Sequence, residues 1–549
     1  MRANSVSFML FNLIFFCTGF ALAQTTSDNT EQTLSENKLR AHVKFLSDDL
    51  LGGRAPGTVG SKIAQKYIST EMESFGLKPA FENGTSYLQP FNLVKINVSP
   101  NMDLSFSKNG QQLSFDYYKD FVSVPGVQKK NIKIENAELV FVGYGIQASE
   151  FKWDDFKNTD VKGKVLLIMN NDPDNGDPNF FGGKARLYYG RWDYKYEQAA
   201  KMGAAGAIII HTTPSAGYPW QVVQSSWSRT QVELPKNTDS PLLYEGWITE
   251  EAAYKVLKLS GKDLDQLRKE AEDKDFKPVP LGVSVNASIN ADYSTFKGAN
   301  IGGLLSGSDS KLKDEVVVFT AHYDHLGIGK PIKGDSIYNG ALDNASGVAS
   351  ILTLSEAFSK IDIKPKRSLL FLAVDCEESG LLGSQYFVEH PTFKPSQIAA
   401  DINIDGINIW GKTHDVAIIG YGKSNIDDIV KSIAKSEGRV VVPDPTPEKG
   451  SFYRSDQLNF AKAGVPVLYM DSGHDYAGHP KGWGDKVVEE WVQKTYHQPS
   501  DEYKSSWDLS GEMQDLHLLF ETALHIANQN EMPAWTPGDE FESARKNGL

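Results

Sequence analysis

Residues 316–327 read VVVFTAHYDHLG, an unbroken apolar run that ends in His322 and Asp324. Three further apolar runs follow: SLLFLAV (368–374), DINI (401–404) and VPVLYM (465–470). Apolar runs without polar alternation are typical of strands covered on both faces. Helical patterns separate or follow them at 347–358, 381–389, 425–437 and 513–528. This alternation predicts an α/β/α sandwich around a mixed, largely parallel sheet.

Side chains that can bind a metal ion stand where these runs end or where a helix begins. They are His322, Asp324, Asp343 in YNGALDNASG, Glu377, Glu378, Asp405 and His497 in TYHQPSDEY. In an open α/β sheet the carboxyl ends of the strands form the binding edge, so we expect these groups to converge. Imidazole and carboxylate ligands suit divalent metals, zinc above all. The set is large enough for two metals that share one carboxylate, with a glutamate left for proton transfer.

Taken singly, each motif has a structural explanation. HYDH is typical of a surface turn, EES of a solvated helix start, and DNASG of a helix N-cap. Only their joint appearance in this order, each at an element boundary, favours a metal centre.

Composition bounds the remaining possibilities. The chain has 549 residues, 40% hydrophobic and 23% charged, as expected of a globular protein with two or three domains. Its net charge of -14 and the lack of a long basic run disfavour nucleic acid and anionic membranes as partners.

The N-terminus has the pattern of a secretory signal. Arg2 precedes an apolar stretch at 8–22, and Ala21-Leu22-Ala23 fits a cleavage site before Gln24. Cleavage would remove Cys17 and leave Cys376, the only other cysteine, without an intramolecular partner. We therefore expect Cys376 to be a buried filler, and the mature chain to be exported, without membrane insertion, to a bacterial periplasm or the extracellular space.

The middle of the chain predicts a second α/β unit that holds none of the proposed ligands. AELVFVGYGI (137–146), GKVLLIMNN (163–171) and AGAIIIHTT (205–213) are strand-like, and a helix is expected from Tyr194 to Met202. Two helices, at 35–50 and up to Phe75, precede short strands at 88–125. The expected organisation is a signal peptide (1–23), the first part of a catalytic domain (24–129), an inserted domain (130–287), the main catalytic part (288–530) and a mobile C-terminal tail (531–549).

The segments AHYDHLG, GALDNASG, EESGLLGS, NIDGIN and YHQPSDE resemble the co-catalytic di-zinc exopeptidases, the family of bacterial secreted aminopeptidases and glutamate carboxypeptidase. The likeness extends to the RAPGT loop (54–58) and to RSDQLNFAKAGVP (454–466). The inserted region resembles the protease-associated domain found in many members. The resemblance implies two Zn²⁺ per chain, or other divalent metals, and peptide substrates.

The resemblance also implies a role for each matching residue. Asp343 would bridge the metals, with His322 and Asp405 on one and Glu378 and His497 on the other. Glu377 would be the general base, Asp324 would orient His322, Tyr496 would stabilise the oxyanion, and Arg454 would contact substrate. The peptide bond after Asp343 is expected to be cis. His325, His474 and His479 are expected to be loop or supporting residues.

The predicted function is an exported zinc-dependent aminopeptidase. Glu377 and Asp405 suit the ammonium group of a free N-terminus. Relatives that bind a C-terminal carboxylate carry an added helical domain, whereas only residues 498–549 follow His497 here. The alternatives are a carboxypeptidase of the glutamate carboxypeptidase type, for which Arg191 would be a suitable ligand, a single-metal glutaminyl cyclase, and an inactive receptor-like homologue. The sequence does not determine the side-chain preference, the native metal or the oligomeric state.

Overall fold

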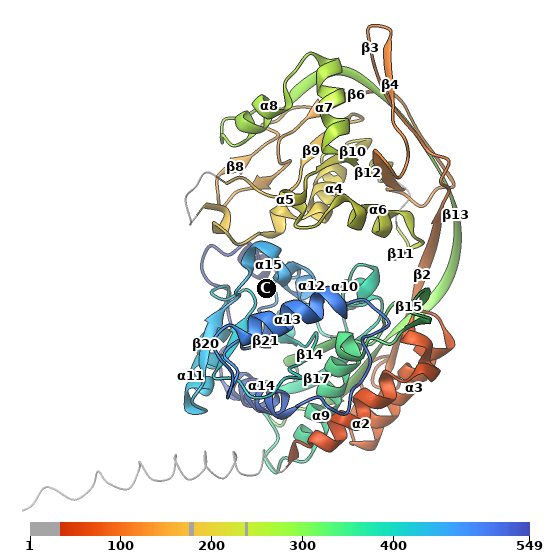
Figure 1. Ribbon diagram of the computed structural model, residues 1–549. Helices are drawn as coiled ribbons and strands as arrows, with labels where there is room; N and C mark the ends of the chain where they lie inside the picture. Colours follow the sequence, from red (N-terminus) through yellow and green to blue (C-terminus); the bar gives the residue numbers. More distant parts are fainter. Residues whose placement is uncertain (1–32, 175–179, 237–239, 549) are drawn as a thin grey trace, which may run out of the picture.

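The computed structural model describes residues 33–174, 180–236 and 240–548. One long strand, β13 (Val279–Leu305), runs through two units and joins their sheets (Figure 1). Up to Asn290 it pairs with β6 (Asn131–Phe141), and from Ala291 it pairs with β2 (Leu88–Val98). We call residues 33–98 and 291–548 the main unit and residues 99–290 the inserted unit.

The main unit is built on a mixed sheet with four neighbouring parallel strands. In spatial order these are β17 (Ser368–Val374), β14 (Val316–His322), β18 (Ile398–Asn403) and β21 (Val467–Ser472). Antiparallel β13 flanks β17, and β19 (Asp415–Ile418), antiparallel to β21, is paired with β20 (Val440–Pro443). Short β1 (Lys78–Pro79) extends the sheet beside β13. All residues of β14, β17 and β18 are buried, which confirms the predicted parallel core.

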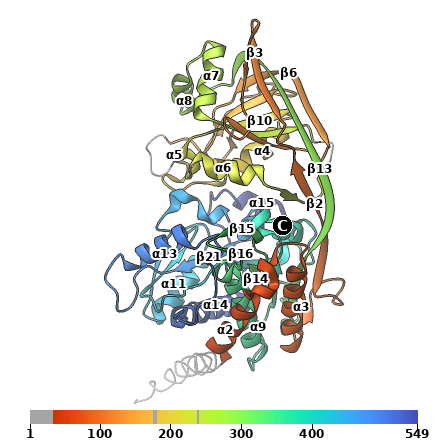
Figure 2. The same ribbon diagram turned by 45° about the vertical axis from the view of Figure 1, so that its right-hand side comes forward.

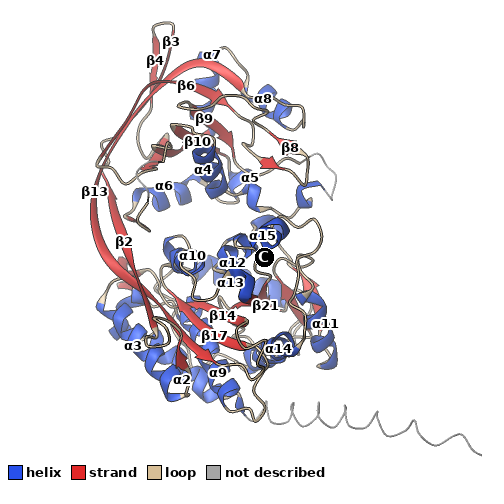
Figure 3. Ribbon diagram, turned by 180° about the vertical axis from the view of Figure 1, so that it is seen from behind, coloured by secondary structure: helices blue, strands red, loops and turns tan. Residues whose placement is uncertain are grey.

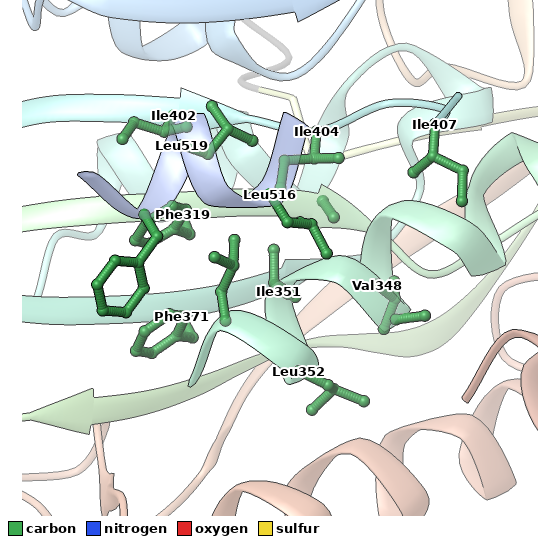
Figure 4. Close-up of a cluster of buried hydrophobic side chains, with 14 of the residues drawn as sticks. Phe319, Val348, Ile351, Leu352, Phe371, Ile402, Ile404, Ile407, Leu516 and Leu519 are labelled. Atoms are coloured by element: carbon green, nitrogen blue, oxygen red, sulfur yellow. The ribbon is translucent and has the colours of Figure 1, made fainter. Parts of the chain in front are cut away.

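Helices cover both faces of this sheet. One face carries α2 (Glu36–Leu46), α3 (Val59–Ser74), α9 (Ser346–Ser359), α11 (Ile426–Ser436) and α14 (Ser510–Asn528). The other carries α10 (Leu382–Glu389) and α12 (Gln457–Lys462). Because strand side chains alternate, Phe319 and Phe371 meet α9 and α14 (Figure 4), whereas Val316 and Val318 face α10 and α12. The predicted α/β/α sandwich is confirmed.

The inserted unit has its own sheet and its own cores. Next to β6 lie parallel β9 (Val165–Met169), β10 (Gly206–His211) and β12 (Tyr244–Thr249), then antiparallel β5 (Phe121–Pro125). The hairpin β3 (Asp103–Lys108) and β4 (Gln111–Ser114) pairs with β13, and β7 (Gln147–Ala148) pairs with β8 (Trp153–Asp154). One face of the sheet packs on α7 (Glu250–Ser260) and α8 (Leu264–Ala271). The other packs on α4 (Trp192–Lys201) and α6 (Trp220–Ser228), with short α5 (Thr213–Ala216) beside them.

Strand pairing favours a division of the chain that differs from the expected boundaries at 130 and 287. Strands β3, β4 and β5, expected in the first part of the catalytic domain, belong to the inserted sheet. We therefore propose that the inserted unit begins near residue 99 and ends near residue 290, inside β13. An amphipathic strand pattern does not show which of two sheets the strand will join.

The two units contact each other over an apolar surface. Seen from behind, β13 curves along one edge of both units, with β2 beside it in the main unit (Figure 3). Tyr188 and Phe181 of the inserted unit share a buried cluster with Tyr453 and Phe452 of the main unit. Lys462 binds the hydroxyl of Tyr188 at 2.8 Å across this boundary.

The C-terminal segment is packed, so the expectation of a mobile tail from residue 531 is wrong. Trp535 and Phe541 are buried, and α15 (Glu542–Gly548) follows. Arg545 donates to the carbonyl oxygens of Pro395 and Ile398. Two isolated aromatic residues in a polar stretch anchor this segment.

Two other expectations concern the N-terminus and Cys376. The expected signal peptide, residues 1–23, lies outside the described residues, within which no helix is long and apolar enough to span a membrane. Cys376 is free and buried, which confirms its expected place in the core.

Candidate metal centre

The proposed ligands come together at the carboxyl edge of the main sheet. Strand β14 ends at His322, and Asp405 lies two residues beyond β18. Glu378 lies in the turn η5 (Glu377–Ser379) after β17, and Asp343 lies in η4 (Ala341–Ala345), directly before α9. His497 follows α13 (Trp483–Lys494). Five segments far apart in the sequence therefore meet because parallel strands present their ends to one edge.

Asp343 stands between two histidines. Its Oδ1 lies 3.2 Å from Nε2 of His322, which is also 3.1 Å from Oδ1 of Asp405. Its Oδ2 lies 3.1 Å from Nε2 of His497, which is also 3.3 Å from Oε2 of Glu378. Each oxygen of Asp343 thus belongs to a separate histidine–carboxylate group.

These spacings fit divalent metal ions. Ligand atoms in a tetrahedral zinc site with bonds of about 2.0–2.1 Å lie about 3.3 Å apart, close to the four distances above. Among the described residues, two groups of side chains are compact enough to hold an ion: His322, Asp343 and Asp405, as expected, and His325, Asp343 and Glu378, in which His325 stands where His497 was expected. Imidazole nitrogens and carboxylate oxygens are among the ligands that bind zinc and other divalent metals.

Burial and charge compete strongly at this centre. Burial lowers the pKa of His497, but the charges of Glu378 and Asp343 outweigh burial and raise that pKa to about 9. Burial raises the pKa of Asp343, but His322 and His497 outweigh burial and hold that pKa well below its usual value. Asp343 is therefore ionised, as a bridging ligand must be.

Glu377 is the carboxylic acid with the opposite behaviour. Burial, with the charges of Asp405 and Glu378, raises its pKa well above the ordinary value, while His322 opposes the shift. A carboxylate whose proton affinity is raised beside the proposed ligands is suited to accept a proton from water.

Asp324 connects two of the ligand loops. It is fully buried, and its Oδ1 accepts the main-chain N–H of Glu377 at 3.0 Å. Nδ1 of His322 lies 3.2 Å from the carbonyl oxygen of Asp324 and 3.7 Å from its carboxylate. The closer partner of His322 is thus the main chain of residue 324, not the side chain that we expected to orient it.

His325, which we expected to be a loop or supporting residue, lies directly beside the proposed ligands. It is buried, and its Nδ1 lies 2.7 Å from Oε1 of Glu378, at an angle that forms no hydrogen bond. Its ring also contacts that of His497. The signal in the sequence was its place three residues after His322 in HYDH. His474, by contrast, pairs with Asp485, and His479 stacks on Trp483.

Two residues outside the predicted set hold the loops in place. Arg54 of the RAPGT loop is fully buried and donates to four carbonyl oxygens, those of Leu46, Tyr323, Asn339 and Gly340. Asp501 of the QPSDE segment accepts the N–H groups of Leu342 and Asp343 at 3.0–3.2 Å. Both lie in motifs noted in the sequence, but only the tertiary structure shows what they bind. The expected cis peptide bond between Asp343 and Asn344 is also confirmed.

Tyr496 and Arg454 border the centre. The ring of Tyr496 stacks on that of His497, with ring centroids 3.9 Å apart. Burial, with the charges of Asp343 and Glu378, raises its pKa, so the hydroxyl is a proton donor at neutral pH. The pKa of Arg454 is lowered by burial and by Arg191 of the inserted unit, and Tyr496 opposes that shift.

Sheet order and ligand geometry together define an α/β protein with a candidate two-ion centre at the sheet edge. Residues 300–520 match the model of Peptidase family M28, and residues 135–240 match that of the PA domain. The chain thus carries a peptidase family M28 region with a PA domain inserted in the fold, which confirms the resemblance seen in the motifs.

Individual relatives are similar over parts of the chain. A vacuolar membrane protease of Clavispora lusitaniae is 37% identical over 119 residues, 22% of this chain and 10% of that protein. Aminopeptidase YwaD of Bacillus subtilis is 28% identical over 207 residues, 37% of this chain and 39% of that protein. The chain therefore spans less than half the length of these relatives. The solved structure of an aminopeptidase from Aneurinibacillus sp. strain AM-1 aligns with this one with a TM-score of 0.51 at 18% identity. The alignment covers 92% of this chain and 97% of that chain, so the two share the fold.

Proposed function

We propose that the protein is a metallo-exopeptidase that holds two zinc ions and hydrolyses the terminal peptide bond of a peptide. The observation that carries this proposal is the division of Asp343, one oxygen to the His322–Asp405 group and the other to the His497–Glu378 group. The match to a peptidase family supports the reaction class. A pair of bound ions would lower the pKa of water and polarise the scissile carbonyl.

The chain's own residues would carry the proton and orient the groups. Glu377 would take the proton of the attacking water and return it to the leaving amine, for which its raised pKa is suited. The hydroxyl of Tyr496, kept protonated, would donate to the oxygen that becomes negative. Arg54 and Asp501 would keep the ligand loops in register through the main-chain contacts described above.

We infer that the enzyme removes residues from the N-terminus. Carboxylates crowd the centre, and Glu377 and Asp405 suit the ammonium of a free N-terminus. The name of the Bacillus subtilis relative points the same way. The second candidate is a carboxypeptidase, and a specific observation favours it. Arg191 and Arg186 of the inserted unit lie close to Arg454: besides burial, the charge of Arg191 lowers the pKa of Arg454, and the charges of Arg454 and Arg191 lower that of Arg186. Such a group of arginines suits a carboxylate.

The test is a peptide series assayed with added zinc and after chelation. Cleavage of a C-terminally amidated peptide, with an N-acetylated one left intact, is the expected result. Cleavage of only the acetylated peptide would establish the carboxypeptidase. One bound ion and release of ammonia from an N-terminal glutamine would indicate a glutaminyl cyclase, and no hydrolysis by a chain with bound metal would indicate a receptor-like protein.

We also propose that the chain is exported before it acts. The signal-like pattern at residues 1–23 supports export, whereas the Clavispora relative is named a vacuolar membrane protease. Sequencing the N-terminus of the mature protein from fractionated cells tests the proposal. A chain that starts at Gln24 in the periplasm or medium is expected, and an intact Met1 in the cytoplasmic fraction would contradict it.

A further inference from the structure

The inserted unit places Arg229 beside the candidate metal centre. Arg229 caps the C-terminal end of α6 and is exposed. Its Nη2 donates to the main-chain carbonyl oxygen of Glu378 at 3.4 Å. Glu378 is the residue whose carboxylate meets His497. A guanidinium from one unit thus lies next to a proposed ligand of the other.

The position of Arg229 is braced from both sides. Immediately after it, β11 (Gln231–Glu233) pairs with β2 of the main unit, with Gln231 opposite Ile96 and Glu233 opposite Val94. Figure 1 shows β11 between the two units, and Figure 2, turned by 45°, shows α6 and β2 at the same boundary. Thr230 donates to Asn97 at 2.7 Å, and the amide of Gln231 donates to the carbonyl oxygen of Arg229 at 2.9 Å. Two units therefore hold the backbone that carries this side chain.

Most of the binding capacity of Arg229 is unused. A guanidinium has five N–H donors in a planar fork that matches a carboxylate. Within the described chain, the guanidinium of Arg229 donates one hydrogen bond, to Glu378, and no carboxylate forms an ion pair with this guanidinium.

We propose that Arg229 binds a carboxylate of the substrate beside the scissile bond, so that the centre prefers peptides that carry such a group. The proposal rests on the proposed peptidase function and adds the chemical class of the substrate. The carboxylate has two possible sources, the free C-terminus of a short peptide or the side chain of an aspartate or glutamate next to the cut bond. Both present the same two oxygens to the guanidinium.

Matched substrate pairs test the proposal. One pair is a dipeptide and its C-terminal amide, and the other is a tripeptide amide with Glu or Gln at its second position. The quantity to compare is the ratio of kcat/KM within each pair. We expect the wild type to favour the acidic member of at least one pair by about 10- to 100-fold, as for a hydrogen bond to a charged group. In Arg229→Gln that ratio should fall to about one, and Arg229→Lys should retain part of it.

Lys255→Gln is the matched control, because it removes one positive charge from an exposed position of the same unit. Its substrate ratios should equal those of the wild type. The pair whose ratio falls in Arg229→Gln identifies the source of the carboxylate. A wild type that does not distinguish the members of either pair would overturn the proposal, as would an Arg229→Gln variant that slows both members equally.

Binding separates this inference from the peptidase function. Calorimetry with the same four peptides on Glu377→Gln and on Glu377→Gln/Arg229→Gln gives the ratio of Kd values without turnover. If the wild type hydrolyses none of the peptides, the proposed function fails, and the Kd ratios still decide the role of Arg229. Equal Kd values for acidic and neutral peptides on Glu377→Gln would refute carboxylate binding even if hydrolysis is observed.

Discussion

The two units each bury a charged centre, and they neutralise it in different ways. In the inserted unit, Lys195 is fully buried and donates to the carbonyl oxygens of Asn171 and Tyr189 at 2.8 and 2.6 Å. Burial lowers its pKa, and the nearby carboxylates of Asp172 and Asp155 oppose that shift. The chain itself therefore provides the cation of this centre.

The main unit gathers its carboxylates without such a lysine. Asp324, Asp343, Glu377, Glu378 and Asp405 meet at the sheet edge. Arg54 is fully buried near them, and although burial lowers its pKa, the charges of Asp324, Asp343 and Glu378 oppose that shift. Like Lys195, Arg54 donates to main-chain carbonyls, through four hydrogen bonds, and forms no ion pair with a carboxylate among the described residues; here, however, one such cation faces five carboxylates. A buried carboxylate cluster needs positive charge to stay ionised, so this centre suits bound divalent ions in a way that the Lys195 centre does not.

The strongest test of this contrast is Asp343→Ala. Loss of the shared carboxylate should remove both ions and reduce hydrolysis below detection, because each proposed site loses one of its ligands. Metal content by mass spectrometry and activity are the measurements, and Asp362→Ala, at an exposed position, is the control. Two tightly bound ions in Asp343→Ala would refute the bridging role.

Glu377→Gln should separate catalysis from metal binding. The amide cannot accept a proton, so kcat should fall by about 10²- to 10⁴-fold, while metal content and melting temperature stay as in the wild type. Glu378→Gln should instead weaken metal binding. If Glu378→Gln keeps both ions and loses only turnover, the roles of the two glutamates are reversed.

Lys195→Met probes the other centre. Removal of the ammonium leaves the carbonyl oxygens of Asn171 and Tyr189 without their donor and takes positive charge away from Asp155 and Asp172. The free energy of unfolding of the inserted unit should fall by about 1–3 kcal/mol for each carbonyl. Denaturant unfolding and limited proteolysis are the measurements, with exposed Lys201→Met on the same helix as control. Metal content should not change; a loss of metal in Lys195→Met would show that the two centres are coupled.

Acid should destabilise the main unit through His42, by less than the substitutions above are expected to change activity or stability. His42 is buried on α2, 2.8 Å from the hydroxyl of Tyr67, and burial lowers its pKa from 6.5 to about 4. The unfolded chain therefore binds the proton first, so this contribution to stability is complete above pH 6.5 and is lost as the pH falls toward 4. The shift corresponds to about 3 kcal/mol.

The measurement is the free energy of unfolding of the wild type and His42→Gln at pH 7 and pH 4.5. The wild type should lose more stability than the variant over this interval, and His390→Gln, at an exposed position, should behave like the wild type. Identical pH dependence in the wild type and His42→Gln would show that His42 does not contribute.

Much of the main unit could be predicted from the sequence by itself. The apolar runs at 316–322 and 368–374 are long enough and uniform enough to specify buried strands, and His322, Glu377 and Asp405 follow from their place at or just beyond strand ends. Parallel topology then brings these residues to one edge without further information.

Other features depended on contacts between residues far apart in the chain. Strand patterns at 103–125 are compatible with either sheet, and only pairing with β12 and β13 decides between them. The packed segment around Trp535, the proximity of His325 to Glu378, and the approach of Arg229 to the same residue are likewise tertiary. Local sequence determines periodicity and element type, but a contact between distant residues is determined by the packing of whole elements, which no local pattern records.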